Sequence, residues 1–159
     1  MKERVRELAV EELPAMAKIL KEWEQCSCII RIDMDYVVKS AATQMRNGNG
    51  TVFGLFDRAG EIIGGLGCIK GPDLACGIMT AIETFWFVAP GRRGNGLKLL
   101  DAFEQWAEDN DCPRTAMIHL VDFQPEVLTR LYQDRGYRLI EQHFVKGWQP
   151  IEGWEDDDD

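Results

Sequence analysis

The chain has 159 residues, 45% hydrophobic and 28% charged, which is ordinary for one soluble globular domain. No apolar run reaches the roughly 20 residues of a membrane-spanning helix, and the charged N-terminus lacks a signal peptide's apolar core, so we expect a cytoplasmic protein without a membrane partner. Removing the five acids at 155–159 from the net charge of −9 leaves −4, which argues against nucleic acid as a partner and suits an amine-bearing substrate.

The first half of the chain predicts two helices and then a three-stranded meander. A strand is expected at 5–10, and apolar residues at helical spacing follow the acids and proline of 11–14, so a helix is expected over 13–25. A second helix begins after a cap at Asp33 or Asp35 and ends before the glycines of 47–50. The predicted strands of the meander are 51–56, 61–69 and 76–88.

The second half predicts a helix after Gly96, a short buried strand, a further helix and a last strand; the last three span 115–121, 125–134 and 139–148. Gly136 is expected to end the helix in the left-handed conformation. This order predicts an α/β (mixed α+β) fold, with a mixed, mostly antiparallel sheet of six to seven strands and about four helices. The domain would span 1–149, followed by a disordered acidic tail at 150–159.

The five cysteines do not form a metal site by spacing. Their number is odd, the pair at 26 and 28 is too close for a zinc knuckle, and His119 and His143 lie far away in the sequence. We expect reduced thiols and no metal; the cysteines are Cys26, Cys28, Cys68, Cys76 and Cys112.

The segment 85–100 organises the chain, because an apolar strand leads through a glycine-rich turn directly into an amphipathic helix. The first turn of such a helix has unpaired N–H groups and a positive dipole end. Arg92, Arg93 and Lys98 add positive charge within a few residues. The pattern favours a pyrophosphate site, although a glycine turn that only packs strand against helix would have the same sequence.

Two motifs in this order resemble the GNAT family of N-acetyltransferases. Val88-Ala89-Pro90 precedes Arg93-Gly94-Asn95-Gly96, and Leu131-Tyr132-Gln133-Asp134-Arg135-Gly136-Tyr137 matches the family's later motif. Gly91 and Pro125 depart from residues often seen at these positions. In general style the sequence is also similar to small acetyltransferase-like proteins of tailed bacteriophages, whose location would be the host cytoplasm.

The resemblance implies direct transfer of an acetyl group from acetyl-coenzyme A to a primary amine, without a metal, in a protein that forms a homodimer in some relatives. It also implies a binding site for coenzyme A. The turn would bind the pyrophosphate, and the main chain of Phe87 and Val88 would bind the pantetheine arm. The residues of the turn are Arg92, Arg93, Gly94, Asn95, Gly96 and Leu97.

Three side chains are candidates for the chemistry. Glu83 is the expected general base, unless it is an outward-facing strand carboxylate, and His119 is the second candidate, unless it is a core histidine. Tyr132 matches the family's acid for the departing thiolate, with a core tyrosine as the alternative. Two other functions remain open: a catalytically weak protein that binds a partner through this fold, and a domain that binds another nucleotide.

Overall fold

The computed structural model describes residues 3–27, 29–92 and 94–146. The expected acidic tail at 150–159 lies outside these residues. In chain order the elements are β1 (Arg4–Glu7), the 3-10 turn η1 (Val10–Glu12), α1 (Leu13–Glu24), α2 (Met34–Arg46), β2 (Gly50–Phe56), β3 (Ile62–Pro72), β4 (Met79–Val88), α3 (Leu97–Asp109), β5 (Arg114–Ala116) and α4 (Pro125–Asp134).

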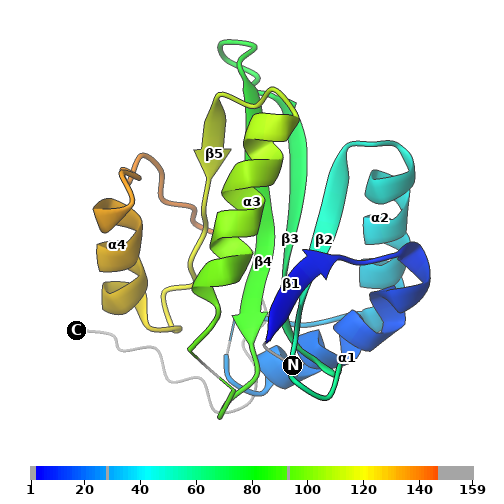
Figure 1. Ribbon diagram of the computed structural model, residues 1–159. Coiled ribbons are helices and arrows are strands. Elements are labelled where there is room, and N and C mark those ends of the chain that lie inside the picture. The colour runs from blue at the N-terminus through cyan, green and yellow to red at the C-terminus, as the bar shows by residue number, and fades with distance from the viewer. Residues whose placement is uncertain (1–2, 28, 93, 147–159) are drawn as a thin grey trace.

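The sheet has the order β1-β2-β3-β4-β5 and is mixed, as predicted (Figure 1). The first four strands are antiparallel neighbours, and β5 returns parallel to β4 after the crossover through α3. Helix α3 lies across one face of the sheet, and α1 and α2 cover the other. This arrangement leaves β5 at the edge of the described sheet, with α4 beyond it.

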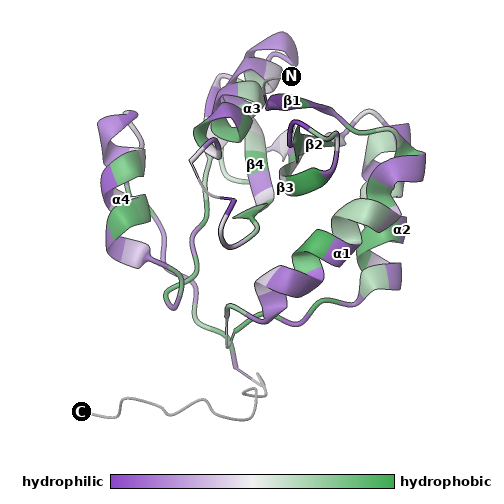
Figure 2. Cartoon of the chain, turned by 60° about the horizontal axis from the view of Figure 1, so that its bottom comes forward, coloured by the Kyte–Doolittle hydropathy of each residue, from purple (hydrophilic) through white to green (hydrophobic). Residues whose placement is uncertain are grey.

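Two apolar clusters hold the layers together. Leu99, Leu100 and Phe103 of α3 pack on one face of the sheet, and Leu13 and Met16 of α1 pack on the other with α2. All seven residues of β2 are buried, which is why its sequence reads as a continuous apolar run. Figure 2 shows hydrophobic bands along α1 and α2.

The helix signals in the sequence are confirmed. Of the two candidate caps for α2, Asp33 is the one that acts, because its carboxylate accepts a hydrogen bond from the Tyr36 N–H at 2.9 Å. Helix α4 begins at Pro125, and Gly136 has a φ of +89° just beyond its end. Within the described ranges, no helix is long and apolar enough to cross a bilayer.

The described residues form fewer strands than the six to seven predicted. The described residues form five strands, because 139–146 make no ladder; residues 147–148 of that predicted strand lie outside the description. The apolar side chains of this segment are exposed, with Phe144 at 93%, so no burial stabilises an extended ladder here. Alternation of apolar and polar residues is therefore not sufficient to form a strand when no packed face receives it.

The strand predicted at 115–121 is also shorter and less buried than expected. It ends at Ala116, and Ile118 and Val121 are exposed. The Ile118 N–H does not continue a ladder with the β4 backbone but donates to the carboxylate of Glu83 at 3.0 Å. A side chain of β4 has taken the hydrogen bond that would have extended β5.

We expect Gly64→Ala to destabilise the protein by about 1–3 kcal/mol, because a Cβ at this position would overpack β3 against β4. That atom would lie 2.7 Å from the Phe87 carbonyl oxygen and 2.9 Å from the Val88 Cα. Gly71→Ala on the same strand is the control, because its Cβ would meet no atom within 4 Å. Urea unfolding midpoints measure both, and equal midpoints would contradict the close approach of the two strands.

Candidate active site

The site begins where β4 and β5 separate. Their parallel ladder ends at Ile82, yet β4 continues for six residues beside β3. The N–H of Ala89 donates to β3 at 2.9 Å, and the Phe87 carbonyl also faces β3. Because alternate residues of a strand direct their backbone groups to opposite edges, Trp86 and Val88 direct theirs to the edge that β5 has left.

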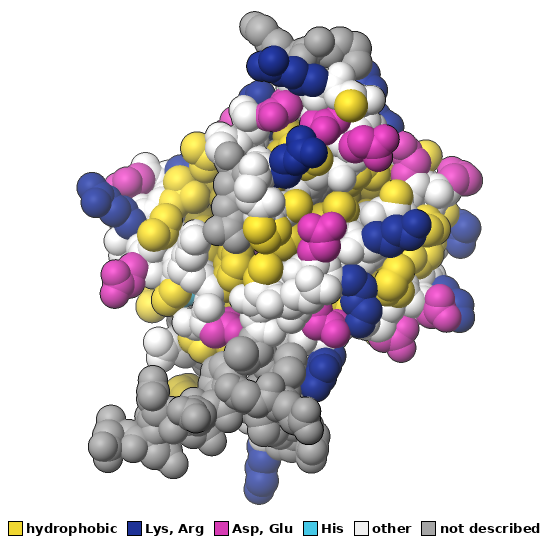
Figure 3. Space-filling model, turned by 90° about the horizontal axis from the view of Figure 1, so that it is seen from below, with side chains coloured by type: hydrophobic (Ala, Val, Ile, Leu, Met, Phe, Trp, Pro, Cys, Tyr) yellow, Lys and Arg dark blue, Asp and Glu magenta, His cyan; other side chains and the backbone are white. Residues whose placement is uncertain are grey.

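A pocket of about 220 Å³ opens along this edge. Its walls are the second half of β4, the segment 118–124 and one side of α4. Seven of the side chains or glycines expected in the site line it: Glu83, Phe87, Val88, Gly94, Gly96, His119 and Tyr132. Figure 3 shows the molecule from the end at which β4 finishes, where hydrophobic side chains gather in the middle of the surface.

The glycine turn places the start of α3 beside the pocket. Gly94 has a φ of +136°, a conformation that only glycine adopts readily. Gly96 lies so close to β4 that an added Cβ would be 3.3 Å from a Val88 methyl group. Among the described residues, no backbone carbonyl accepts from the N–H groups of 94–97, and the first bonded amide is that of Lys98. These N–H groups could therefore bind an anion.

The two polar side chains described in the turn, those of Arg92 and Asn95, have partners outside the pocket. Arg92 forms an ion pair with Asp57 at 3.2 Å, in the turn between β2 and β3. The Asn95 amide donates to the carboxylate of Glu3, and Leu97 is half exposed. Arg93 lies outside the described residues. Of the predicted phosphate site, the structure brings the glycines to the pocket and directs Arg92 and Asn95 to other partners.

Glu83 is a buried carboxyl group inside the pocket wall, with 3% of its surface exposed, so it is not an outward-facing strand residue. It lies at an irregularity of β4, where the register with β3 shifts between Gly67 and Cys68. Burial raises the pKa of Glu83 to about 8, and the hydrogen bond from the Ile118 N–H opposes part of that rise. The group therefore titrates slightly above neutral pH and is largely protonated at pH 7.

Tyr132 faces the pocket from α4. Its hydroxyl donates to the Ile118 carbonyl at 3.3 Å, a long and hence weak hydrogen bond. Its ring packs against Trp86, with centroids 6.3 Å apart. Burial raises the pKa of Tyr132 above its usual value, and the nearby Glu83 charge adds to the rise. The phenol stays protonated and can act as a hydrogen-bond donor.

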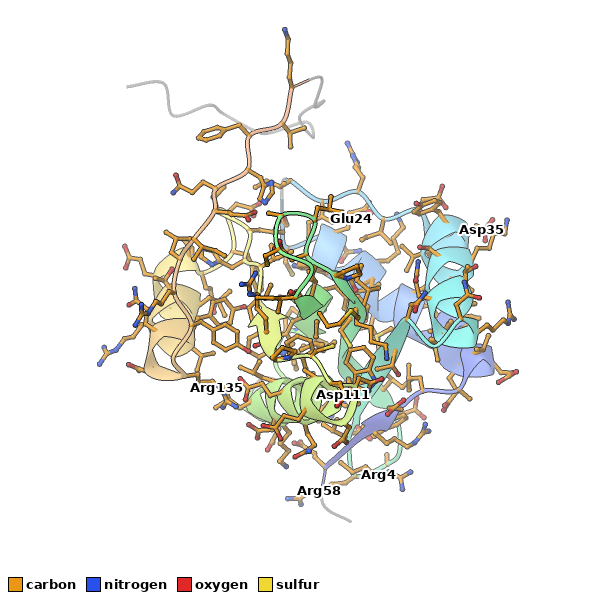
Figure 4. All side chains as sticks on the ribbon, turned by 90° about the horizontal axis from the view of Figure 1, so that it is seen from above. Arg4, Glu24, Asp35, Arg58, Asp111 and Arg135 are labelled. Atoms are coloured by element: carbon orange, nitrogen blue, oxygen red, sulfur yellow. The ribbon has the colours of Figure 1, made fainter. Side chains whose placement is uncertain are left out.

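Helix α4 is fixed to α3 at the end where Arg135 lies (Figure 4). The Arg135 guanidinium donates to Glu104 at 2.5 Å and to Asp101 at 2.7 Å. The Tyr137 hydroxyl donates to the same Glu104 at 3.0 Å. The Arg135 ion pairs tie the C-terminal end of α4, one turn after Tyr132, to α3.

His119 lies on the segment after β5 and is half-buried. It lines the pocket, and its ring centroid is 6.2 Å from that of Tyr132. It is thus a pocket residue and not a fully buried core histidine. It therefore lines the same pocket as Glu83.

Three contributors were not expected from the sequence. The backbone of Ile118 contacts both Glu83, through its N–H, and Tyr132, through its carbonyl. Trp23 of α1 and Phe123 also line the pocket. No local sequence pattern identifies a backbone that will bond to two side chains. Trp23 fits the apolar face of its helix, so the sequence gives no sign that it lines a pocket.

The two departures from the family motifs have simple structural consequences. Gly91 adopts a φ of +77° in the turn after β4. Pro125 occupies the first position of α4, where its missing N–H costs no helical hydrogen bond, and Gln124 before it has a φ of +48° and lines the pocket. Neither departure closes the pocket. In the described part of the chain, no three His, Cys, Asp or Glu side chains are grouped as metal ligands would be.

Comparison with known proteins gives a consistent result. A model of the acetyltransferase (GNAT) family matches residues 3–137, while no curated protein sequence matches the chain. A ribosomal-protein-alanine N-acetyltransferase from Brucella melitensis biovar Abortus 2308 is 17% identical, with a TM-score of 0.70 over 93% of this chain and 100% of its own.

Two structures with a bound coenzyme have the same fold. An aminoglycoside N-acetyltransferase in complex with CoA is 16% identical, with a TM-score of 0.70 over 91% of this chain and 93% of its own. A predicted acetyltransferase with acetyl-CoA, from Clostridium acetobutylicum, is 13% identical, with a TM-score of 0.72 over 91% of this chain and 96% of its own.

The raised pKa of Glu83 predicts how stability depends on pH. A carboxyl group with a folded-state pKa of about 8 and an ordinary value of 4.5 keeps its proton longer in the folded state, so folding stability falls as pH rises between these values. We expect Glu83→Gln to gain stability relative to the parent protein across this window, by an amount on the order of a few kcal/mol at most. Denaturant unfolding of both proteins at several pH values measures it, and a difference independent of pH would contradict the burial of a titrating carboxyl group.

Proposed function

Because this chain belongs to the GNAT acetyltransferase family, we propose that it moves an acetyl group from acetyl-coenzyme A directly to a primary amine. The observation that supports the proposal best is the pocket itself. It joins a glycine turn at a helix N-terminus to a buried carboxyl group and a buried phenol. An anion site and two proton-handling groups are the parts that this reaction needs.

The proposed thioester site has two parts. The pyrophosphate would bind to the N–H groups of 94–97, where the helix dipole favours negative charge. The pantetheine arm would lie along β4 and exchange hydrogen bonds with Trp86 and Val88, as a strand would. The fit is supported by the glycines at 94 and 96, since side chains there would fill the space beside β4 or strain the turn.

The acceptor amine has to lose a proton before it can attack the thioester. An amine with a pKa near 10.4 is neutral in only about one molecule in 2,500 at pH 7, which costs about 4.6 kcal/mol. Glu83 is the proposed base, because its raised pKa brings it closer to that of the amine than an ordinary carboxylate would be. His119 is the alternative base, at the other side of the same pocket.

Tyr132 is proposed to stabilise the leaving thiolate. A thiolate whose acid has a pKa of about 8.5 is a weaker base than the ionised form of this phenol, so full proton transfer from Tyr132 is unfavourable. A hydrogen bond from the hydroxyl costs less, because it only replaces the long bond to the Ile118 carbonyl. The thiolate can then leave with its negative charge partly neutralised.

The test is acetyl transfer measured as thiol release, with a panel of primary amines. We expect kcat/KM to rise with pH and to show a break near pH 8, above which Glu83 is mostly deprotonated. Glu83→Gln should lower kcat by about 100-fold or more and remove that break in the pH profile, as general bases contribute on this scale. His119→Gln should keep the parent kcat and the break in the pH profile.

Tyr132→Phe should lower kcat by about tenfold or more, with a smaller change in the KM for acetyl-coenzyme A, because only the leaving group loses a contact. Tyr137→Phe is the matched control, since this hydroxyl bonds to Glu104 outside the pocket. The proposed roles would be refuted if Glu83→Gln kept its pH break or if both tyrosine variants behaved alike. Coenzyme-dependent binding of a protein partner without any turnover would favour the binding function.

A further inference from the structure

Three aromatic rings pack together at one wall of the pocket, and the middle ring, that of Phe87, is buried, with 2% of its surface exposed. Trp23 and Phe87 are stacked, with centroids 5.8 Å apart and planes 20° from parallel. Phe87 and Phe123 follow at 6.3 Å. The rings come from α1, β4 and the segment before α4, and all three residues line the pocket. We call them the ring group.

The ring group lies on the face of β4 opposite to the proposed thioester groups. Neighbouring residues of a strand point to opposite faces, so Phe87 points away from Trp86. Trp86 packs on the α3 side, near Gly96 and Tyr132. Trp23 packs with the cluster on the α1 side. The thioester would therefore occupy one half of the pocket, leaving the ring group for the acceptor.

In the described part of the chain, the pocket offers a single group that can become negatively charged near neutral pH. Glu83 is the one carboxyl group among the described lining residues. Two other carboxylates, one at the end of α1 and one before α4, are already hydrogen-bonded: Glu24 accepts from Lys21 and from the Ile32 N–H, and Asp122 accepts from Ser27 at 2.8 Å. A second ammonium group inside the pocket would lose its hydration without meeting a matching charge, which is costly.

The indole of Trp23 points to a missing binding partner. Its Nε1 is buried and has no hydrogen-bond partner among the described residues. Buried donors are nearly always paired, and leaving one unpaired destabilises the free protein. A hydrogen-bond acceptor on a bound molecule could satisfy it.

We propose that the acceptor is a monoamine on an aromatic body, and that Trp23 and Phe123, backed by the buried Phe87, bind this body while its amine reaches Glu83. The inference rests on the proposed acetyl transfer and narrows it. It separates this protein from one that acts on polycationic amines, which need several carboxylates around the acceptor. An aromatic body adds ring contacts and apolar burial that an aliphatic polyamine cannot make.

The test compares acceptors under saturating acetyl-coenzyme A. Phenethylamine, tyramine and tryptamine represent the proposed class; ethanolamine is a monoamine without a ring, and spermidine and kanamycin are polycations. We expect kcat/KM to be at least about tenfold higher for the best arylalkylamine than for ethanolamine or either polycation. Equal or better use of a polycation would overturn the proposal.

Variants of the ring group test where the aromatic body binds. Phe123→Leu and Trp23→Phe keep an apolar side chain, so the fold should persist, and we expect each to raise the KM for the arylalkylamine by about threefold to tenfold. Tyr36→Leu, which removes an exposed ring on α2, is the control and should change nothing. Unchanged KM values in both ring-group variants would overturn the assignment of the body to this wall.

Calorimetric titration of the same proteins with acetyl-coenzyme A tests the proposed acetyl transfer separately from the proposed acceptor class. If acetyl-coenzyme A does not bind, the proposed function itself fails. If it binds equally to the parent and to the ring-group variants while polycations are the better acceptors, only the acceptor class fails. Unchanged coenzyme binding together with a raised arylalkylamine KM is the result that supports both.

Discussion

The hydrogen bond between the Ile118 N–H and the Glu83 carboxylate is the contact on which the rest of the site depends. It occurs one residue beyond the last paired position of β4 and two beyond that of β5. Because the amide is satisfied by a side chain, the backbone after Ala116 has no need to follow β4. The two strands separate, the pocket opens between them, and the edge of β4 at Trp86 and Val88 is left for another extended chain.

The same contact joins the two groups that would handle protons. The Ile118 carbonyl accepts from Tyr132, so the backbone of one residue bonds to both the carboxyl group and the phenol. This arrangement carries a cost, since a buried carboxyl group destabilises the folded protein whenever it is ionised. The cost is offset by two well-packed clusters on either side of the sheet and by the Arg135 contacts that fix α4. Functional sites commonly keep such unfavourable groups.

Much of the fold could be predicted because its signals are local. Asp33, Pro125 and Gly136 mark helix ends through their own backbone chemistry, and the meander strands are separated by short turns. The family motifs directed attention to Glu83 and Tyr132 without giving their burial or their link through Ile118. That link joins positions 35 residues apart, and no periodicity encodes it.

The errors in the predicted strands also arise from contacts between residues far apart in the sequence. Ile118, Leu120 and Val121 have strand-forming side chains, yet the backbone there is taken by a long-range contact, so the strand stops at Ala116. The segment 139–146 alternates like a strand but has no packed face to bury it. The ring group could not be predicted from the sequence either, because Trp23 and Phe123 contact Phe87 only in the folded chain.

The central claim is that the open edge of β4 binds the thioester arm as an added strand would. Backbone amide hydrogen exchange, followed residue by residue by NMR with and without coenzyme A, tests it most directly. We expect exchange at the Trp86 or Val88 amide to slow by about tenfold or more on saturation, with no comparable change at Ala81, which the β3–β4–β5 ladder already holds. Unchanged exchange at both edge amides, in a protein that binds coenzyme A, would contradict the account.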